Sequence, residues 1–337
     1  MTNDSIDSES SSIAKEEPTR FRRNVNSALI GLQISVAVAG LLTSLADWSW
    51  IAELLANLRM QLIFAGVAMV VLAAMTKRWK LLAIQFVLLG LHFNWIAMSP
   101  DRATSSAGPS SLTVTSVNVY INNQHYDMIA DVLQRTDSDV IMVTELGPAL
   151  CEYLRNTLAD SHLHVADESY PGPFGVAIFS KYPLSDVDLI GTATTGTTLL
   201  ATVQTDHHRY RVAAVHPYSP MTPNHLRLRD QHLDTLSREV RTVHQQQPDV
   251  PFIVMGDFNL TPWSPGFRTF QQSTGLRHVT DGWGMQPTWY ARGRSWFPLG
   301  LVLDHCLVSP QLNRVKRQLG PTVVSDHLPL TVHLSHD

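Results

Sequence analysis

The sequence predicts an α/β domain that follows three membrane-spanning helices. Three observations support this architecture. The first hundred residues hold three windows without any Asp, Glu, Lys or Arg, at 28–46, 60–76 and 81–100. Beyond residue 111, short β-branched segments alternate with amphipathic ones, as in domains whose packed sheets are flanked by helices. Polar side chains follow several of the expected strands, and strand ends at one edge of a sheet converge on a common site.

Composition excludes several classes of protein. Only 16% of the 337 residues are charged, whereas about 25% is usual in soluble proteins. A hydrophobic fraction of 44% excludes disorder as a description of the whole chain. The 25 Lys and Arg residues against 29 Asp and Glu give a net charge of −4, which disfavours a strongly basic nucleic-acid binder. The two cysteines, Cys151 and Cys306, could form one disulfide or remain two buried thiols, and their number does not decide between these states.

The first hundred residues are expected to form a disordered tail and a transmembrane anchor. Residues 1–24 are expected to be a disordered cytoplasmic tail, because this segment is rich in Ser, Asp and Glu. Residues 25–100 are expected to form a three-helix transmembrane anchor, since a bilayer core takes roughly 20 apolar residues per helix. The second window is short, and we expect Trp50, Ile51, Leu54 and Leu55 to extend it. A buried helical bundle in a soluble protein and a cleaved signal peptide are the alternatives.

Positive charges beside the spans predict the orientation of this integral membrane anchor. Four Lys and Arg residues precede the first span and three lie between the second and third, whereas only Arg59 and Arg102 lie near the other two ends. Positively charged flanks stay in the cytoplasm. We therefore expect a cytoplasmic N-terminus and an extracytoplasmic position for everything after residue 100, in the periplasm or at the cell exterior if the protein is bacterial.

Residues 101–111 are expected to be a polar linker rich in Ser, Gly and Pro, and residues 112–337 one α/β domain. Alternating and β-branched runs predict strands at 112–119, 139–145, 175–180, 199–204, 210–216, 251–256, 301–309 and 330–334. Helical patterns are expected at 126–135, 148–158 and 223–245.

Polar residues gather at the ends of these strands. They are Asn118, Glu145, His216, Asp257, Asn259, Asp304, Asp326 and His327. Most of them offer hard oxygen ligands, so the set favours Mg²⁺ or Mn²⁺ over a Cys-rich zinc site. His305 alternates to the other face of its strand and is expected to be structural.

Several short motifs carry a family resemblance. They are SVNV (116–119), the strand that ends in Glu145, GVAIFSKYP (175–183), AAVHPYSP (213–220), GDFNLTPWS (256–264), LDHCLVS (303–309) and SDHLPL (325–330). In this order they resemble the endonuclease/exonuclease/phosphatase (DNase I-like) superfamily, which includes exonuclease III, sphingomyelinases and inositol-phosphate 5-phosphatases. The resemblance covers about residues 112–335. The spans, with PTW (287–289) and TPWS (261–264), look like its bacterial membrane-anchored branch.

The resemblance implies a four-layer αββα sandwich that hydrolyses a phosphate ester with Mg²⁺, or with Mn²⁺ in its place. It implies a metal site of three ligands, which are Glu145, Asn118 and Asp326. The substrate phosphate would be bound by Asn118, His216 and His327.

The implied catalytic residues are Asp257, Asn259, Asp304, His216 and His327. Asp257 would accept a proton from the attacking water, which Asn259 helps to hold. Asp304 would keep His327 cationic for the transition state, and His216 would bind phosphate or protonate the leaving group.

Membrane tethering favours an extracytoplasmic or lipid-linked phosphate ester as the substrate. Residues 101–337 contain 17 Lys and Arg against 22 Asp and Glu, with Lys181 and Lys316 the only lysines, which disfavours a long polyanion. A membrane-tethered nuclease acting on DNA or RNA is the first alternative, and a catalytically silent binding module the second. A sensor or transporter built from the spans is a further one. The expected partners are the bilayer and the phosphate-ester substrate, and no protein partner is indicated.

Overall fold

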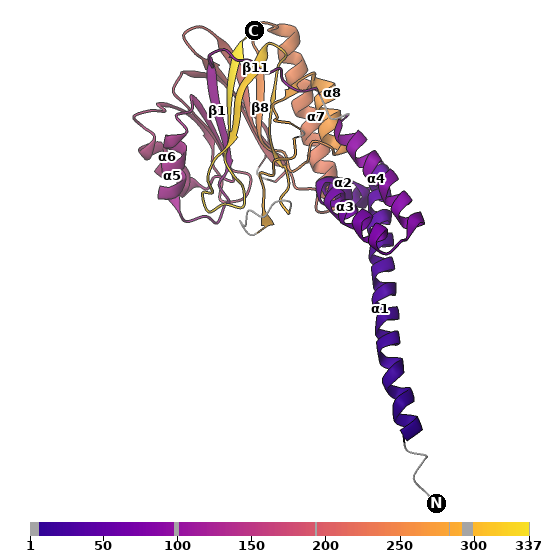
Figure 1. Cartoon of the computed structure of the whole chain (residues 1–337). Helices are drawn as coiled ribbons and strands as arrows, with labels where there is room; N and C mark the ends of the chain where they lie inside the picture. The colour runs from indigo at the N-terminus through magenta and orange to yellow at the C-terminus, as the bar shows by residue number, and fades with distance from the viewer. Residues whose placement is uncertain (1–6, 98–100, 193, 283, 292–298, 337) are drawn as a thin grey trace, which may run out of the picture.

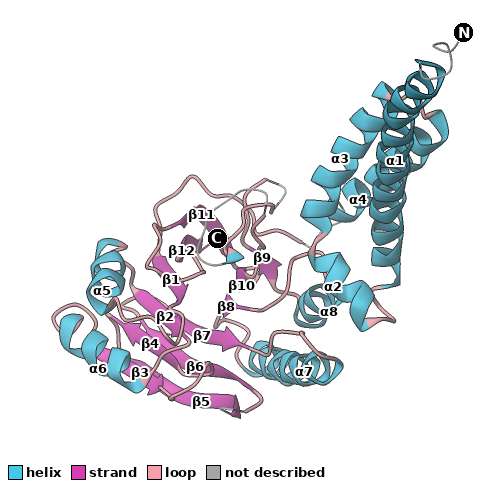
Figure 2. Cartoon of the chain, turned by 90° about the horizontal axis from the view of Figure 1, so that it is seen from below, coloured by secondary structure: helices cyan, strands magenta, loops and turns pink. Residues whose placement is uncertain are grey.

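The computed structural model describes the chain apart from residues 1–6, 98–100, 193, 283, 292–298 and 337. A bundle of apolar helices meets one corner of an α/β sandwich (Figure 1). The bundle contains α1 (Asp7–Leu42), α3 (Arg59–Met75) and α4 (Trp79–Ala97), which run side by side in Figure 2. A short 3₁₀ helix (Thr43–Leu45) and α2 (Trp50–Asn57) connect α1 to α3.

Two helical segments of the bundle, Arg23–Leu45 and Trp79–Ala97, are long and apolar enough to cross a membrane. The third candidate is the pair formed by α2 and α3, which is bent by 71°. Trp50, Ile51, Leu54 and Leu55, which were expected to extend the second span, are therefore joined to it through a sharp bend, so the pair could cross a membrane only as a broken span. These residues form their own helix, whose buried residues include Glu53 and Asn57, and both of these contact the sandwich.

The first helix is longer than the sequence predicts. It begins at Asp7 and so includes most of residues 1–24, which were expected to be a disordered tail. The expected linker at 101–111 also differs, because Arg102 and Ser105 form β-bridges with His278 and Arg314 of the sandwich.

The sandwich is built from two six-stranded sheets, with strand orders β11-β12-β1-β2-β4-β3 and β5-β6-β7-β8-β10-β9. The first sheet contains β1 (Leu112–Asn118), β2 (Val140–Thr144), β3 (His164–Glu168), β4 (Val176–Ser180), β11 (Leu312–Leu319) and β12 (Leu330–His336). The second contains β5 (Leu184–Thr192), β6 (Gly196–Gln204), β7 (Arg209–His216), β8 (Phe252–Asp257), β9 (Arg277–His278) and β10 (Asp304–Val308).

Three apolar layers hold the sandwich together and confirm the four-layer prediction. The inner faces of the two sheets share one core that includes Met142, Ile178 and Val212. Helices α5 (Tyr126–Arg135) and α6 (Pro148–Thr157) cover the outer face of the first sheet. Helices α7 (Pro223–Gln246) and α8 (Pro265–Thr274) cover that of the second. Burial of these layers is the main stabilising contribution.

The two sheets have matching topologies around their centres. Strands β1 and β2 are parallel, as are β7 and β8, while β12 and β10 pair antiparallel with β1 and β8. The carboxyl ends of the two parallel pairs therefore face the same edge of the sandwich. Polar residues at those ends are brought together by topology rather than by sequence proximity.

Strands β3 and β5 were missed by the sequence analysis, as were β9, β11 and helix α8. Strand β5 has only intermediate or exposed residues along its length, so it lacks the apolar alternation that marks a half-buried strand. Both cysteines are free and buried, Cys151 in α6 and Cys306 in β10, which resolves the disulfide question in favour of two thiols.

A buried histidine pair joins β9, β10 and the loop after β8. His278 Nε2 lies 3.1 Å from His305 Nδ1, and His305 Nε2 donates a hydrogen bond to the carbonyl of Leu260 (2.7 Å). Burial lowers the pKa of His305 to about 4 and holds that of His278 well below its ordinary value. His305 thus fixes the loop next to the site instead of entering it.

These depressed pKa values predict acid sensitivity. Between pH 6.5 and about 4 the unfolded chain binds protons that the folded chain excludes, so the free energy of unfolding falls as the pH falls. Each such histidine contributes up to about 1.4 kcal/mol per pH unit. We expect His305→Gln to lower the melting temperature at pH 7 and to flatten its decline toward pH 4.5. The same change at the exposed His207 is the control, and an unaltered slope in His305→Gln would contradict this origin.

Candidate active site

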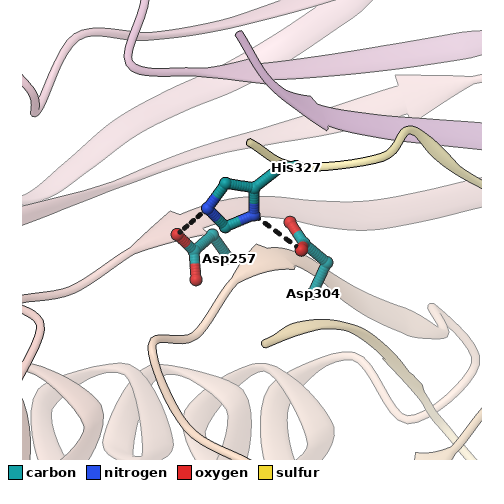
Figure 3. Close-up of side chains that lie close together, drawn as sticks. All are labelled: Asp257, Asp304 and His327. Carbon is teal, nitrogen blue, oxygen red and sulfur yellow. Dashed lines mark hydrogen bonds and ion pairs between the residues drawn. The ribbon is translucent and has the colours of Figure 1, made fainter. Parts of the chain in front are cut away.

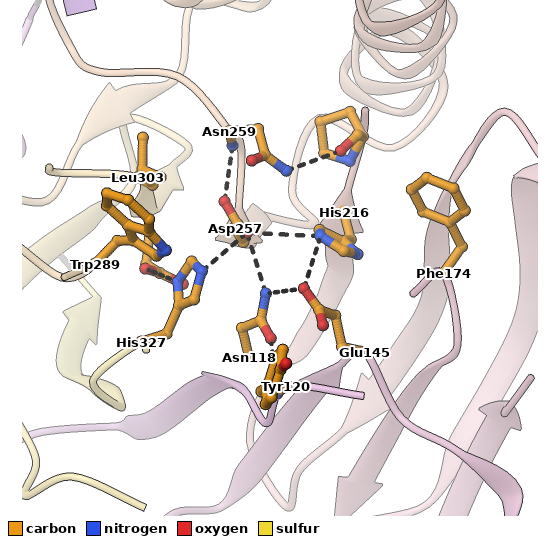
Figure 4. Close-up of polar contacts among 12 residues, drawn as sticks. Asn118, Tyr120, Glu145, Phe174, His216, Asp257, Asn259, Trp289, Leu303 and His327 are labelled. Atoms are coloured by element: carbon orange, nitrogen blue, oxygen red, sulfur yellow. Dashed lines mark hydrogen bonds and ion pairs between the residues drawn. The ribbon is translucent and has the colours of Figure 1, made fainter. Parts of the chain in front are cut away.

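Asp257 lies at the centre of the polar cluster, at the end of β8. Its carboxylate accepts a hydrogen bond from Asn118 Nδ2 (3.1 Å) and lies 3.5 Å from Nε2 of both His216 and His327 (Figure 4). The backbone N–H of Asn259 donates to its other oxygen at 2.8 Å. Burial alone would raise the pKa of Asp257, but the two imidazoles and this N–H lower it to about 2. The group is therefore an anion at neutral pH.

His327 bridges two carboxylates, as Figure 3 shows. Its Nδ1 donates to Asp304 Oδ2 at 2.8 Å, while Nε2 faces Asp257 at 3.5 Å. Burial opposes the imidazolium, but Asp304 and Asp257 together raise the pKa of His327 to about 10. Asp304 starts β10 directly opposite Asp257 on β8, and Thr288 Oγ1 accepts its backbone N–H. The ring is therefore a fixed cation.

Asn118 and Glu145 come from the ends of the parallel pair β1 and β2. Asn118 Nδ2 donates to Glu145 Oε1 (2.9 Å), and the N–H of Ile121 donates to Glu145 Oε2 (3.0 Å). Glu145 has φ of 56°, a left-handed conformation that is unfavourable for a non-glycine residue. Tyr120 and Asn259, at φ of 61° and 53°, share this conformation, and such strain clusters at functional sites.

His216 completes the cluster from the end of β7. Its Nε2 lies 3.5 Å from Asp257 and 3.9 Å from Glu145, while Nδ1 is buried without a hydrogen-bond partner among the described residues. Its ring packs on Phe174, with centroids 5.6 Å apart. Burial would lower the pKa of His216, but Asp257 and Glu145 raise it. The two imidazoles thus lie on either side of the central carboxylate.

The structure brings six of the eight predicted side chains into one hydrogen-bond and ion-pair network. They are Asn118, Glu145, His216, Asp257, Asp304 and His327. Asn259 joins through its backbone, while its side chain donates to the carbonyl of Pro217 (3.0 Å). Asp326 is partly exposed, and its carboxylate accepts a hydrogen bond from Trp289 Nε1 (2.8 Å).

Sequence reasoning gave no site role to Trp289, Phe174 or Thr288. Trp289 also forms β-bridges with His327 and Leu301, so it links two of the segments that border the site. The PTW motif at 287–289 was the available signal for Trp289 and Thr288. Nothing in the sequence around Phe174 distinguishes it from a core aromatic residue.

Two groups of side chains are candidate metal ligands. Ligand atoms of Asp257, Asp304 and His327 lie within 4.8 Å of one another. A protonated imidazole is a poor metal ligand, however, and both ring nitrogens of His327 face carboxylates. In the second group, Glu145 accepts hydrogen bonds from Asn118 Nδ2 and the N–H of Ile121, while Asn118 Oδ1 accepts that of Tyr120 (3.0 Å), and such carboxylate and amide oxygens suit Mg²⁺ or Mn²⁺. Asp326 as a third ligand stays a prediction.

Comparisons with known proteins agree with this geometry. The model of the Endonuclease/Exonuclease/phosphatase family matches residues 115–327. The human nocturnin catalytic domain with bound sulfate is 17% identical, with a TM-score of 0.56 over 72% of this chain and 99% of that one. The endonuclease/exonuclease/phosphatase from Beutenbergia cavernae is 18% identical, with a TM-score of 0.55 over 67% of this chain and 71% of that one. At these identities the likeness concerns the fold. No curated protein matches the chain.

The two metal-ligand groups make different predictions for Mn²⁺ binding. We expect Glu145→Gln to weaken binding at least about tenfold, because it removes a charged ligand from an oxygen site while keeping the side chain's shape. Isothermal titration calorimetry of the detergent-solubilised full chain with Mn²⁺ measures this loss of affinity. Glu168→Gln, at the exposed end of β3, is the matched control. A larger loss in Asp304→Asn than in Glu145→Gln would move the metal to the Asp257–Asp304–His327 group.

Proposed function

The chain belongs to the endonuclease/exonuclease/phosphatase family and is a hydrolase of phosphate ester bonds, and from this premise we propose that it is a membrane-anchored, Mg²⁺-dependent phosphoesterase. The observation that carries the proposal is the buried network around Asp257, in which two anionic groups and two imidazoles face one edge of the sandwich. The complete set of carboxylates and imidazoles in this network favours a hydrolase over a silent binding module.

The proposed reaction is an in-line attack of water on phosphorus. Mg²⁺ held by Glu145 and Asn118, with Asp326 as a further ligand, would supply positive charge to the phosphoryl oxygens. The anionic Asp257 carboxylate orients the attacking water and takes its proton as the new bond forms. Asn259 is held beside Asp257 by its own backbone and orients the same water.

The two histidines act on the phosphate from opposite sides of Asp257. His327 stays cationic through neutral pH and binds the charge that develops on the phosphoryl oxygens. His216 is closer to Glu145 and binds phosphate or donates a proton to the leaving oxygen. Both groups are fixed by hydrogen bonds or ion pairs, so little reorganisation accompanies the reaction.

Contacts with the helical bundle support a membrane-proximal substrate. Trp50 Nε1 donates to the carbonyl of Pro220 (2.7 Å), and Gln61 Nε2 donates to that of Gly300 (2.6 Å). Both carbonyls belong to loops at the edge of the sandwich that carries the site. Exposed apolar side chains lie on these and neighbouring loops, namely Tyr120, Tyr170, Met221, Leu299 and Val324. A lipid-linked phosphate ester matches both features, because its apolar part would remain near the bilayer.

The orientation proposed for the anchor is a cytoplasmic N-terminus with an extracytoplasmic sandwich, in the periplasm or at the exterior of a bacterial cell. It rests on the excess of Lys and Arg before α1 and between α3 and α4. The substrate would then be an extracytoplasmic one.

The substrate class is tested with the purified full chain, Mg²⁺ and four kinds of substrate: DNA, RNA, phospholipids and polyprenyl pyrophosphates. We expect turnover of a lipid-linked phosphate ester. Asp257→Asn should lower kcat by about 10²–10⁴-fold, the usual contribution of a positioned base. The control is Asp249→Asn, an exposed change in the loop before β8. Cleavage of nucleic acid alone would replace the lipid proposal by the nuclease alternative, and unchanged turnover in Asp257→Asn would refute the mechanism.

Topology is tested by fusing a reporter after residue 337. A phosphatase reporter that works only outside the cytoplasm should be active, and a fluorescent reporter that folds only in the cytoplasm should be dark. The reverse pattern would invert the proposed orientation while leaving the hydrolase assignment intact.

A further inference from the structure

The bend between α2 and α3 packs directly against the active-site loops. We call this segment, residues 50–61, the elbow. It meets three loops of the sandwich: Trp50 contacts the loop after β7 at 217–222, Asn57 the loop after β8 at 258–264, and Gln61 the segment before β10 at 300–303. These loops are the immediate neighbours in sequence of His216, Asp257 and Asp304.

Asn57 makes the most specific of these contacts. Its Oδ1 accepts hydrogen bonds from both the backbone N–H (2.9 Å) and the hydroxyl (2.8 Å) of Thr261. Its carbonyl accepts a bond from Trp263 Nε1 at 3.4 Å, and its Nδ2 donates to the carbonyl of Glu53 (3.1 Å). Asn57 is 7% exposed and Thr261 fully buried, so water cannot replace these bonds without a change of structure.

The same loop is held from its other side by the sandwich itself. His305 Nε2 donates to the carbonyl of Leu260, the residue before Thr261. Leu260 follows Asn259, whose left-handed backbone places its N–H on Asp257. The loop from 257 to 263 therefore runs between His305 on β10 and Asn57 on the elbow. A strained turn persists only where its surroundings define it fully.

Other contacts keep the elbow in one position. Glu53 and Arg229 of α7 form a buried ion pair at 2.8 Å, and both side chains are at most 7% exposed. Trp263 and Val302 join Met60, Ile63 and Ile96 of the bundle in one apolar cluster. The elbow is thus fixed to the sandwich by an ion pair, several hydrogen bonds and apolar packing, which is more than a tether requires.

We propose that Asn57 is a positioning residue for the hydrolytic site: it holds Thr261, and through the strained turn at Asn259 it sets the position of the Asp257 carboxylate. The helical bundle would then contribute to the turnover rate of the site as well as placing the sandwich at the membrane. This inference rests on the proposed hydrolase function where it is tested by kcat. The second test, hydrogen exchange of the loop amides, does not depend on that function. Asn57 does not touch the network around Asp257, so it acts through the loop.

The test uses the full chain in lipid nanodiscs with Mg²⁺ and bis(p-nitrophenyl) phosphate as the probe. We expect Asn57→Ala to lower kcat at least about tenfold, since small displacements of a reacting group are costly. KM should stay within about twofold, because the phosphate contacts at Asn118 and His327 remain. Thr261→Val, which removes the hydroxyl but keeps the backbone N–H, should lower kcat by a smaller factor.

The matched control is Asn26→Ala. Asn26 Oδ1 accepts a hydrogen bond from Arg78 Nη2 (2.6 Å), so the change also deletes one amide contact, here between α1 and the turn that joins α3 to α4. Asn26→Ala should keep the kcat of the unaltered chain. Equal kcat in Asn57→Ala and Asn26→Ala would overturn the proposal, as would a rise in KM with kcat unchanged.

Hydrogen exchange separates failure of this inference from failure of the proposed function. Amides of residues 258–264 should exchange faster in Asn57→Ala than in the unaltered chain, while those of β1 and β2 do not change. If the unaltered chain does not cleave the probe, the exchange result alone decides the positioning role, and unchanged exchange refutes it. If Asn57→Ala unfolds globally, Thr261→Val is measured in the same way and decides it.

Discussion

The buried carboxylate of Asp257 is the group on which the rest of the site depends. A buried anion is costly unless it is paired and hydrogen-bonded. Asp257 meets this requirement with Asn118 from the opposite sheet, two imidazoles and the N–H of Asn259. Because these partners come from both sheets, the anion is stable only when the two halves of the sandwich are correctly packed. Active-site geometry and sheet packing are therefore parts of one constraint.

The matching topologies of the two sheets carry different chemistry. At the end of the parallel pair β1 and β2 stand an amide and a carboxylate, Asn118 and Glu145. At the end of the corresponding pair β7 and β8 stand an imidazole and a carboxylate, His216 and Asp257. The first pair is the more anionic and suits a cation, whereas the imidazoles of His216 and His327 suit phosphate oxygens. The site is therefore divided into a cation-binding half and a phosphate-binding half because different residues stand at the ends of similar strands.

Much of the fold and site could be predicted from the sequence because the informative residues end buried strands. Asn118, His216 and Asp257 each follow an apolar run, so their convergence follows from strand direction alone. The bend at Leu58 could not be predicted in this way, since residues 50–57 have the hydropathy of a span. Their separate direction results from burying Glu53 and Asn57 against α7 and the loop after β8. Strand β5 and the role of Trp289 also depend on tertiary contacts, which single-sequence periodicity does not register.

The junction between bundle and sandwich has the chemistry of a fixed interface. Breaking a buried ion pair such as that of Glu53 and Arg229 by removing one partner costs about 3–5 kcal/mol. A flexible tether would let the sandwich sample many distances from the membrane, but contacts from Trp50, Asn57 and Gln61 fix three site-edge loops beside the end of the bundle. If the bundle lies in a bilayer, these contacts hold the site-bearing edge of the sandwich at a fixed distance from its surface, which suits phosphate esters located near that surface. A long polyanion would have to approach between that surface and a domain with more acidic than basic residues, so the rigid junction and the charge balance favour the same substrate class.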